Sequence, residues 1–412
     1  MSEKSGTSNG SGHKIAYATL LTRPTYLAGV IILAYSLHKH SPSTPLIIQY
    51  TPSTLPHPCI KALESESKHC NIILHPVEHL RIPPRGPNGT AAATTPDHGM
   101  VAERFADTWT KLRVFDIHAL PQSFDYICFL DADTLVRRDP LPFLLSDEST
   151  RYLAGEQGRL RVLATHVCVC NLDADAWAPP SWTPQNCAYT GAHGADAVPE
   201  VRGGHETLAM FNSGVFVFRP SALLAGFVQS RFRAEDGGVL RGMKFPDQDF
   251  LNGVFAGRWR GVSWRVNALK TWRYWHAGVW TGDEEPAVVH YIVDKPWAQR
   301  VGRRPVQDGR GEESVAGYKG QDGVTHSWWW AEYEAWVANR GFFSASDGVE
   351  REVLGTVRKY VAGEEREERE SEDEGMRAIG GGAQDYAKKW VSGVGRGRVL
   401  GERGHGPVVR QV

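Results

Sequence analysis

Short apolar runs alternate with helix-like segments along the first third of the chain. Strands are expected over residues 14–21, 46–51, 71–77 and 126–130. A helix is expected over 25–39, and an amphipathic helix begins near Phe105, where apolar residues recur at three- and four-residue steps. Strands that alternate with helices predict parallel βαβ units and therefore an α/β, Rossmann-like sheet. Such sheets bind ligands at the carboxyl ends of their strands.

The hydrophobic pattern becomes less regular in the middle of the chain. Residues 156–207 are rich in Pro, Gly, Trp and Cys, and we expect them to form a long insertion. Ordered elements are expected again over 211–219, from Ser221, over 246–256 and over 287–293. We therefore expect one folded domain over 13–345, between a disordered N-terminus, 1–12, and a charged, Gly-rich, disordered tail, 346–412.

The balanced composition excludes several classes of protein. The 412 residues carry 46 Lys and Arg against 47 Asp and Glu, which argues against a nucleic-acid binder. The longest apolar stretch near the N-terminus, 27–37, is too short to cross a membrane, and the first dozen residues lack the apolar core of a secretory signal. Six cysteines are too few for a disulfide scaffold. We therefore expect a cytoplasmic protein with reduced thiols and no membrane partner.

A pair of carboxylates follows the strand expected over 126–130. Asp131 and Asp133 would repel each other unless a cation lay between them, and a divalent ion that prefers oxygen would leave positions open for phosphate. The three-letter pattern alone fits a strand-end turn equally well. A second pair, Asp173 and Asp175, runs into a Trp-Ala-Pro-Pro loop signal, so the first pair is the favoured metal site.

Four motifs that occur in order carry a family resemblance. They are 129–136 (FLDADTLV), 211–218 (FNSGVFVF), 247–252 (DQDFLN) and 290–297 (HYIVDKPW). Together with the start of the chain, 16–29 (AYATLLTRPTYLAG), they resemble glycosyltransferase family 8, the retaining family that includes glycogenin and the plant galactinol synthases. The resemblance implies a GT-A-type fold for a nucleotide-diphospho-sugar transferase, a UDP-sugar donor and Mn²⁺.

The resemblance also implies a role for individual residues. The implied metal ligands are Asp131, Asp133 and His290, and the implied catalytic pair beside the reacting carbon is Asp247 and Gln248. The implied donor-binding residues are Leu20, Thr22, Tyr26, Arg104, Lys111, Ala132, Asn212, Ser213 and Lys295. Two carboxylates and an imidazole also suit Mn²⁺ better than a metal that prefers thiolates. Structural roles stay open as alternatives for Tyr26 and His290 in the core and for Asn212 in a turn.

The sequence departs from the family at two places. The family often has a glycine shortly before the Lys-Pro-Trp motif, and this glycine allows the backbone to contact a diphosphate. In this chain Val293 and Asp294 stand there instead, so that contact is not expected. Arg23 stands where glycogenin-like chains have an asparagine, so different contacts to the base are expected.

Two further residue clusters have alternative interpretations. Cys168, Cys170 and Cys187, with His166 or His193 nearby, could bind structural zinc, but their spacing is not that of paired CxxC motifs. Buried reduced thiols are therefore favoured. Ten of the 14 tryptophans lie between residues 259 and 336, and the helical spacing of Trp328, Trp329, Trp330, Tyr333 and Trp336 predicts a C-terminal helical extension docked on the core. An exposed Trp that lines an acceptor groove is the alternative.

The favoured function is Mn²⁺-dependent, retaining transfer of a hexose from a UDP-sugar to an acceptor hydroxyl. The acceptor could be a glycan, a polyol or a protein tyrosine such as Tyr189, and a homodimer is a further expectation. Double displacement and front-face attack both stay open. A haloacid-dehalogenase-like phosphatase is an alternative, but Leu135 stands where its motif needs Thr or Val. A non-catalytic carbohydrate-binding scaffold is another, although the complete Asp/Asp/His/Lys set argues against it.

Overall fold

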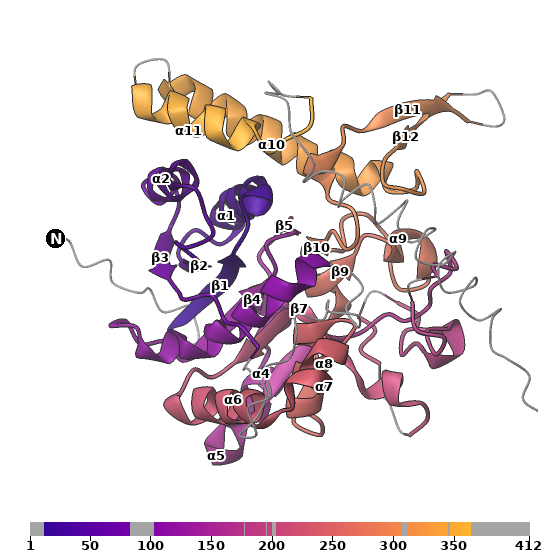
Figure 1. Ribbon diagram of the computed structural model, residues 1–412. Coiled ribbons are helices and arrows are strands. Elements are labelled where there is room, and N and C mark those ends of the chain that lie inside the picture. Colours follow the sequence, from indigo (N-terminus) through magenta and orange to yellow (C-terminus); the bar gives the residue numbers. More distant parts are fainter. Residues whose placement is uncertain are drawn as a thin grey trace, which may run out of the picture.

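In a computed structural model of the chain, seven strands form a central sheet in the order β3-β2-β1-β4-β7-β6-β8 (Figure 1). The structure describes residues 12–82, 103–176, 178–194, 196–199, 203–306, 311–344 and 347–363. The strands of this sheet are β1 (Ile15–Leu21), β2 (Leu46–Tyr50), β3 (Ile72–Pro76), β4 (Tyr126–Leu130), β6 (Val162–His166), β7 (Phe211–Phe218) and β8 (Trp259–Gly261). Only β7 runs antiparallel to its neighbours, so β1, β4 and β6 all end at the same edge.

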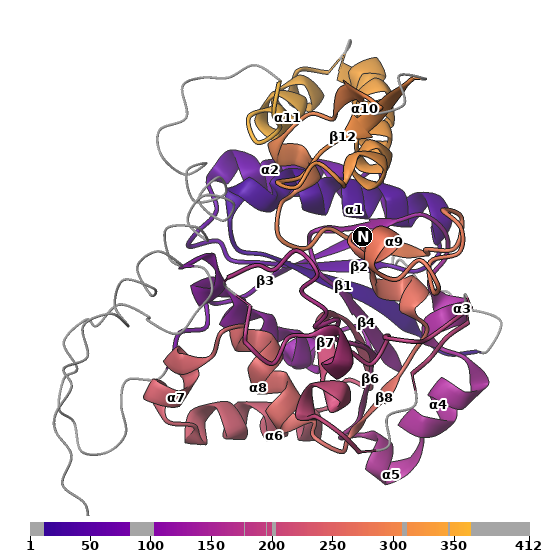
Figure 2. The same ribbon diagram turned by 90° about the vertical axis from the view of Figure 1, so that its right-hand side faces the viewer.

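Helices cover both faces of the sheet (Figure 2). One face carries α1 (Leu27–His40) and α2 (His57–Glu66), and the other carries η2 (Glu103–Ala119), α6 (Ala222–Ala234) and α8 (Pro246–Val254). Along β1, Tyr17 packs into the core on the first face, whereas Ala16 and Ala18 pack into the core on the second. Burial on both faces explains why the strands read as continuous apolar runs, and the expected α/β fold is confirmed.

The helix expected near Phe105 forms with a different geometry. Residues 103–119 adopt a 3₁₀ helix rather than an α-helix. The buried side chains of Trp109, Leu112 and Phe115 recur at every third residue, which is the repeat of a 3₁₀ helix. The sequence pattern correctly identified the buried face, but it did not distinguish the two helix types.

A small second sheet joins the carboxyl edge of the first. It contains β5 (Thr134–Val136), β10 (Val288–His290) and β9 (Ala268–Leu269), in the order β5-β10-β9. β10 runs antiparallel to β5, with His290 opposite Thr134. This register brings His290 beside Asp133, which immediately precedes β5.

Shorter helices complete the domain. The α-helical ones are α3 (Leu141–Leu144), α4 (Asp147–Leu153), α5 (Gly155–Gly158), α7 (Gly237–Gly242) and α9 (Trp272–Trp275). The 3₁₀ helices are η1 (Pro24–Tyr26), η3 (Pro184–Asn186), η4 (Glu206–Ala209), η5 (Trp264–Asn267) and η6 (Pro296–Ala298). Within the range expected to be an insertion, β6 is a strand of the central sheet, and the segment that follows it is largely irregular.

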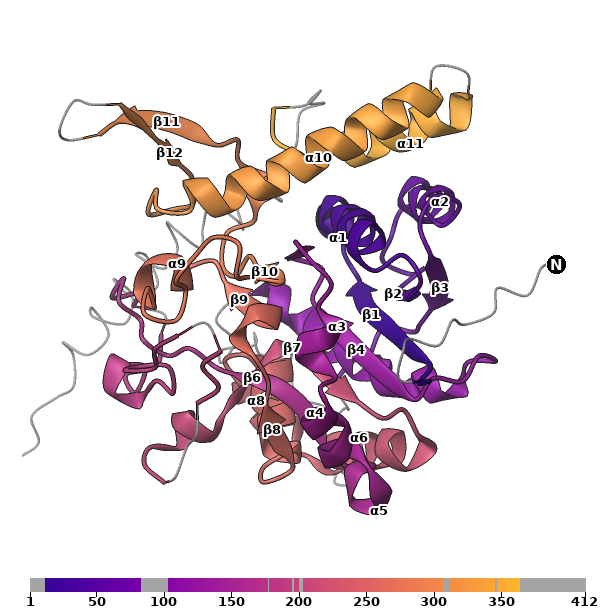
Figure 3. The ribbon, with the colours of Figure 1, turned by 180° about the vertical axis from the view of Figure 1, so that it is seen from behind.

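The C-terminal helices form an outer layer over α1 and α2 (Figure 1). The tryptophan-rich helix α10 (Gly323–Ser344) buries Trp329, Tyr333 and Trp336 in the core, so the expected helical extension is present. A buried ion pair between Arg340 and Glu66 of α2 fixes this layer. Figure 3 shows the hairpin of β11 (Gly302–Pro305) and β12 (Glu312–Val315), which extends beyond the start of α10.

One helix lies where a disordered tail was expected. Residues 348–358 form α11, and its side chains Val353, Leu354 and Val357 are buried against the domain. These residues recur at helical spacing, and that periodicity was masked by the charges around it. The expected tail boundary at 346 was therefore wrong, and the charge blocks beyond residue 363 lie outside the described residues. Within the described ranges, none of the helices combines the length and apolarity needed to cross a membrane.

Candidate active site

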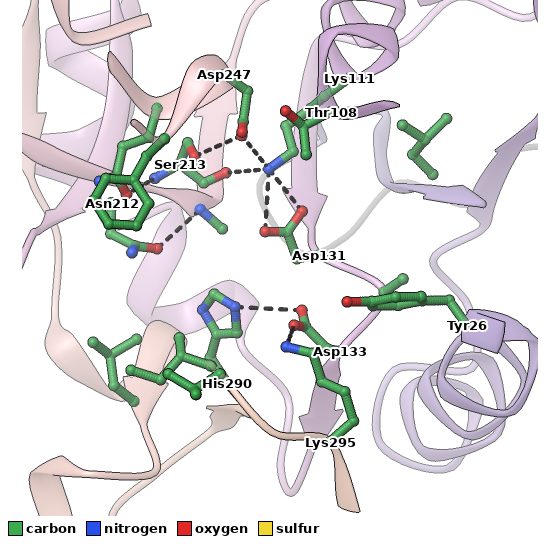
Figure 4. A pocket seen from close by; sticks show the side chains of 18 of the residues that line it. Tyr26, Thr108, Lys111, Asp131, Asp133, Asn212, Ser213, Asp247, His290 and Lys295 are labelled. Carbon is green, nitrogen blue, oxygen red and sulfur yellow. Dashed lines mark hydrogen bonds and ion pairs between the residues drawn. The ribbon is translucent and has the colours of Figure 1, made fainter. Parts of the chain in front are cut away.

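The Asp-Ala-Asp motif turns away from the central sheet at the end of β4. The backbone N–H of Asp131 donates to the carbonyl of Gly214 on β7 at 2.8 Å, and the carbonyl of Asp133 accepts from Tyr291 at 2.9 Å. These bonds hold the two carboxylates beside His290. One ligand atom from each of Asp131, Asp133 and His290 lies within 4.8 Å of the other two (Figure 4). Two distant parts of the chain therefore form one candidate metal site.

Two lysines compensate part of the negative charge in this site (Figure 4). Lys111 Nζ lies 2.8 Å from Asp131 Oδ1 and 2.6 Å from Asp247 Oδ2, and Lys295 forms an ion pair with Asp133. Three carboxylates thus face two ammonium groups. The uncompensated negative charge favours the binding of a further cation.

The pKa values of the two aspartates move in opposite directions. Burial raises the pKa of Asp131 to about 6, an effect that Lys111 opposes and the charge of Asp133 reinforces. Burial also tends to raise the pKa of Asp133, but Lys295 and His290 outweigh it and hold that pKa well below its usual value. Like charges held this close are stabilised when a metal cation binds between them.

A buried amide orients the imidazole of His290. His290 Nδ1 lies 2.8 Å from Asn267 Oδ1, which can only accept, so Nδ1 donates and Nε2 is left with its lone pair for a ligand. Asn267 in turn donates to Asn212 Oδ1 at 2.8 Å and to Thr165 Oγ1 at 2.9 Å. Nε2 lies 3.3 Å from Asp133 Oδ1. Sequence reasoning missed Asn267, although a lone amide within an apolar segment is the signal of a buried polar contact.

Two glycines permit the close packing of the motifs. A Cβ atom on Gly214 would lie 2.3 Å from His290 Cε1, so a side chain there would displace the imidazole. A Cβ on Gly29 of α1 would lie 2.6 Å from the carbonyl oxygen of Ala132 and equally close to the ring of Trp297. Gly214 of β7 therefore leaves room for the imidazole of His290. Gly29 of α1 leaves room for the Asp-Ala-Asp backbone at Ala132 and for the ring of Trp297.

The proposed catalytic pair lies at the start of α8, across the cavity from the metal cluster. Asp247 Oδ2 accepts from Ser213 Oγ at 2.9 Å as well as from Lys111. The side chain of Gln248 accepts from the backbone N–H of Ser213 at 3.4 Å. Both side chains are buried, and Asp247 lies in the first turn of α8, where the helix dipole favours a carboxylate.

The remaining sequence-predicted residues line the same cavity, with one exception. Leu20, Thr22, Tyr26, Lys111, Ala132, Asn212, Ser213 and Lys295 all contribute to its wall. Tyr26 packs against Trp297 at a ring-centroid distance of 5.6 Å. Arg23 also lines the cavity and pairs with Asp107. Arg104 lies in the first turn of η2, but its side chain is outside the described residues.

The position that often carries glycine in family 8 has an unusual backbone. Val293 adopts φ of 65°, a left-handed conformation that strongly disfavours a β-branched residue, and it lines the cavity. Asp294 turns away to pair with Lys270 at 2.9 Å. The backbone therefore keeps the glycine-type conformation although the glycine itself is absent.

The second Asp-Ala-Asp sequence lies outside this cavity. Asp175 accepts a hydrogen bond of 2.6 Å from Tyr318, and neither Asp173 nor Asp175 is among the residues that line the cavity. The aromatic wall of the cavity comes from elsewhere: Trp182, in the insertion, stacks on Phe245 with a centroid distance of 5.0 Å and an interplanar angle of 10°. Among the described lining residues, none of the tryptophans between 259 and 336 appears.

Comparison with known proteins identifies one family. The sequence model described as "Glycosyl transferase family 8" matches residues 18–300, and no curated protein matches the chain. Among solved structures, the galactosyltransferase LgtC in complex with donor and acceptor sugar analogs is similar, with 17% identity and a TM-score of 0.42, over 69% of this chain and 90% of that one. The glycosyltransferase GlyE from Streptococcus pneumoniae has 14% identity and a TM-score of 0.42, over 86% and 67%. Mouse xyloside xylosyltransferase 1 has 11% identity and a TM-score of 0.35, over 68% and 97%.

Proposed function

We propose, because this chain belongs to glycosyl transferase family 8, that it moves a hexose from a UDP-sugar to an acceptor hydroxyl with retention of configuration, and that it requires Mn²⁺. Membership of the family makes the chain a glycosyltransferase of the hexosyltransferase class. The donor, the metal and the stereochemistry form the content of the proposal. The observation that supports it best is the convergence of Asp131, Asp133 and His290 in one lysine-lined cavity.

The chemistry of the three ligands fits Mn²⁺. Asp131 and Asp133 offer carboxylate oxygens and His290 offers Nε2, a donor set that suits Mn²⁺ better than a thiolate-seeking metal. Three protein ligands leave coordination positions for oxygens of the donor diphosphate. When bound, the metal would neutralise negative charge on the departing UDP.

Two lysines of the chain would act on the same charge. Lys295 lies at the cavity wall beside Asp133, where its ammonium can donate to the diphosphate. A charge-assisted contact of this kind contributes about 1.5–3 kcal/mol. Lys111 bridges Asp131 and Asp247 and so links the metal cluster to the catalytic pair. Both lysines are buried, which strengthens their electrostatic effect on the bound donor.

Asp247 is the carboxylate that we propose acts on the reacting carbon. Lys111 and Ser213 both donate to its Oδ2 and thereby fix the orientation of the carboxylate. In that orientation Asp247 would stabilise positive charge on the anomeric carbon or attack it. Azide added to an Asp247→Ala variant distinguishes the two: double displacement predicts a glycosyl azide of inverted configuration, whereas front-face attack predicts none.

The aromatic wall suggests a carbohydrate or polyol acceptor. Trp182 and Phe245 stack on each other in the cavity wall, and aromatic faces are suited to sugar rings. Tyr189 is a poor acceptor because it is 1% exposed and packs against Trp272 at 4.2 Å. A cytoplasmic location and a homodimer stay as expectations from the sequence alone.

A panel of UDP-sugars tests the proposal. We expect one UDP-hexose to release UDP in the presence of Mn²⁺ and not after its removal, and the product to keep the anomeric configuration of the donor. Release of phosphate from phosphomonoesters in place of UDP would favour the phosphatase alternative. The absence of any turnover with the whole panel would favour the non-catalytic scaffold.

A further inference from the structure

A second cluster of metal-ligating side chains lies at the end of β6. Cys168 and Cys170 follow this strand, Cys187 follows η3 in the insertion, and His276 ends α9. All four side chains are buried, with at most 7% of any residue exposed. The sequence-based suggestion of His166 or His193 as the partner of the cysteines was wrong, since the histidine that meets the sulfurs comes from a distant part of the chain.

The four ligand atoms have the spacing of a tetrahedral zinc site. His276 Nε2 lies 3.2 Å from Cys168 Sγ, 3.4 Å from Cys170 Sγ and 3.8 Å from Cys187 Sγ. Cys168 Sγ and Cys187 Sγ are 3.9 Å apart. Tetrahedral zinc with Zn–S bonds near 2.3 Å and Zn–N bonds near 2.0 Å gives S–N edges of about 3.5 Å and S–S edges of about 3.8 Å. The observed distances match those edges.

Neither a disulfide nor the packing of reduced thiols accounts for this geometry as well as a metal does. The sulfurs do not form a disulfide: all six cysteines of the chain are free, and 3.9 Å is far beyond an S–S bond. Packing of reduced thiols, favoured by the sequence, explains burial but gives no reason for three sulfurs to surround one imidazole nitrogen. Thiols are weak hydrogen-bond donors, so such contacts would stabilise little.

A third cluster shows what a metal-free arrangement looks like in this protein. Asp294, Asp322 and His326 also bring ligand atoms within 4.8 Å of one another. There, however, Lys270 Nζ lies 2.7 Å from Asp322 and 2.9 Å from Asp294. The ammonium group of Lys270 therefore takes the place that a metal cation would have in this cluster. The cysteine cluster has no such substitute among the contacts of its described residues.

We propose that Cys168, Cys170, Cys187 and His276 bind one Zn²⁺ in a closed, structural site. Four protein ligands leave no position for a substrate, which distinguishes a structural zinc from a catalytic one. The ion would join the end of β6, the insertion and the segment after α9. Cys168 itself lines the active-site cavity, and Trp182 lies five residues before Cys187, so the zinc would anchor the wall that carries Trp182.

Metal analysis of the purified full-length protein tests this inference. Produced with zinc in the medium, the protein should carry close to one zinc per chain after extensive dialysis. Cys187→Ser and His276→Ala should lose it, whereas His276→Cys, which keeps a tetrahedral ligand set, should retain it. Cys59→Ser removes an equally buried thiol outside the cluster and should leave the zinc content unchanged. Asp131→Asn should also leave it unchanged, which excludes zinc at the carboxylate cluster.

Cobalt substitution provides a second readout, which can be taken on the wild-type protein. Co²⁺ added to the wild-type apoprotein should give visible d–d bands of tetrahedral geometry and a thiolate-to-cobalt charge-transfer band. The charge-transfer band should be stronger in His276→Cys, which adds a fourth thiolate. Folded wild-type protein that holds no zinc and develops no thiolate–cobalt band would overturn the proposal. So would full zinc occupancy in both Cys187→Ser and His276→Ala.

Discussion

The carboxylate cluster at the end of β4 and the cysteine cluster at the end of β6 lie at the same edge of the sheet, yet only the first is built to meet a substrate. Asp131, Asp133 and His290 offer three potential metal ligands, line a cavity and lie beside two lysines. The cysteine cluster offers four potential ligands, all on buried side chains, and only Cys168 of them lines the cavity. The number of protein ligands and the access to solvent, rather than the position in the fold, therefore separate a site for an exchangeable metal from one for a permanent metal.

Chelation should separate the two clusters most strongly. Brief treatment with EDTA should remove all detectable UDP-sugar turnover, because oxygen-rich sites with open positions exchange their metal readily. Addition of Mn²⁺ should restore the activity, while the zinc content stays near one per chain throughout. Joint loss of zinc and activity, with zinc alone able to restore turnover, would contradict the assignment of separate roles.

Asn267 offers a way to weaken the carboxylate cluster without touching a ligand. In Asn267→Leu, His290 loses the acceptor that fixes its tautomer, and the affinity for Mn²⁺ should fall about 10–100-fold. Turnover at saturating Mn²⁺ should be largely retained, as expected for a positioning residue. Titration of activity against Mn²⁺ measures both quantities, and the zinc content serves as the control. An unchanged Mn²⁺ requirement would show that Asn267 does not position His290.

The cluster of Asp294, Asp322 and His326, which contains Lys270, should make the stability of the protein depend on pH. Burial is the main cause of the low pKa of His326, which is about 3, and the positive charge of Lys270 lowers this pKa further. The unfolded chain protonates this residue near its ordinary pKa of 6.5, whereas the folded chain does not until about pH 3. Lowering the pH through this window therefore favours unfolding, by up to about 1.4 kcal/mol per pH unit. Denaturant unfolding at pH 7.5, 6.5 and 5.5 should show a smaller slope for His326→Leu than for the wild type. Equal slopes would exclude a buried neutral His326.

The smallest effect is expected at Val293. Its left-handed backbone costs a non-glycine residue roughly 1–2 kcal/mol, and a glycine there loses about 1 kcal/mol through its greater freedom in the unfolded chain. Val293→Gly should therefore change the free energy of unfolding by no more than about 1 kcal/mol, in the stabilising direction. Thermal unfolding measures this change. The control variant Val301→Gly should instead be destabilised. A clear destabilisation of Val293→Gly would mean that the side chain packs more favourably than the backbone is strained.

Local sequence carried most of the information about the carboxylate cluster. Asp131 and Asp133 directly follow an apolar strand, and His290 and Lys295 lie in one motif, so the pattern predicted the edge where they meet. Sequence reasoning missed Asn267 because a single amide follows no spacing rule, and its role depends on a hydrogen bond between the end of η5 and β10. The antiparallel pairing of β10 with β5, which brings His290 beside Asp133, likewise exists only in the folded chain.

The cysteine cluster could be predicted from sequence only in part. Cys168 and Cys170 are close in sequence, but His276 lies 89 residues beyond Cys187, and only tertiary structure brings it to the sulfurs. The nearer histidines were misleading for this reason, and His166 instead contacts the carbonyl of Leu208 at 3.1 Å. The helix at 348–358 was missed for a different reason, because its three buried apolar side chains, Val353, Leu354 and Val357, stand among charged residues.

The most direct test of the central claim compares Asp133→Asn with Asp173→Asn. Both changes replace one carboxylate of an Asp-Ala-Asp sequence by its neutral isostere, but only Asp133 contacts His290 and Lys295. Mn²⁺-dependent release of UDP from the preferred UDP-sugar should fall on the order of 10³-fold in Asp133→Asn, because Asp133 would hold the metal ion that neutralises the departing diphosphate. It should stay near the wild-type rate in Asp173→Asn. Full activity of Asp133→Asn, or equal losses in the two variants, would contradict the account.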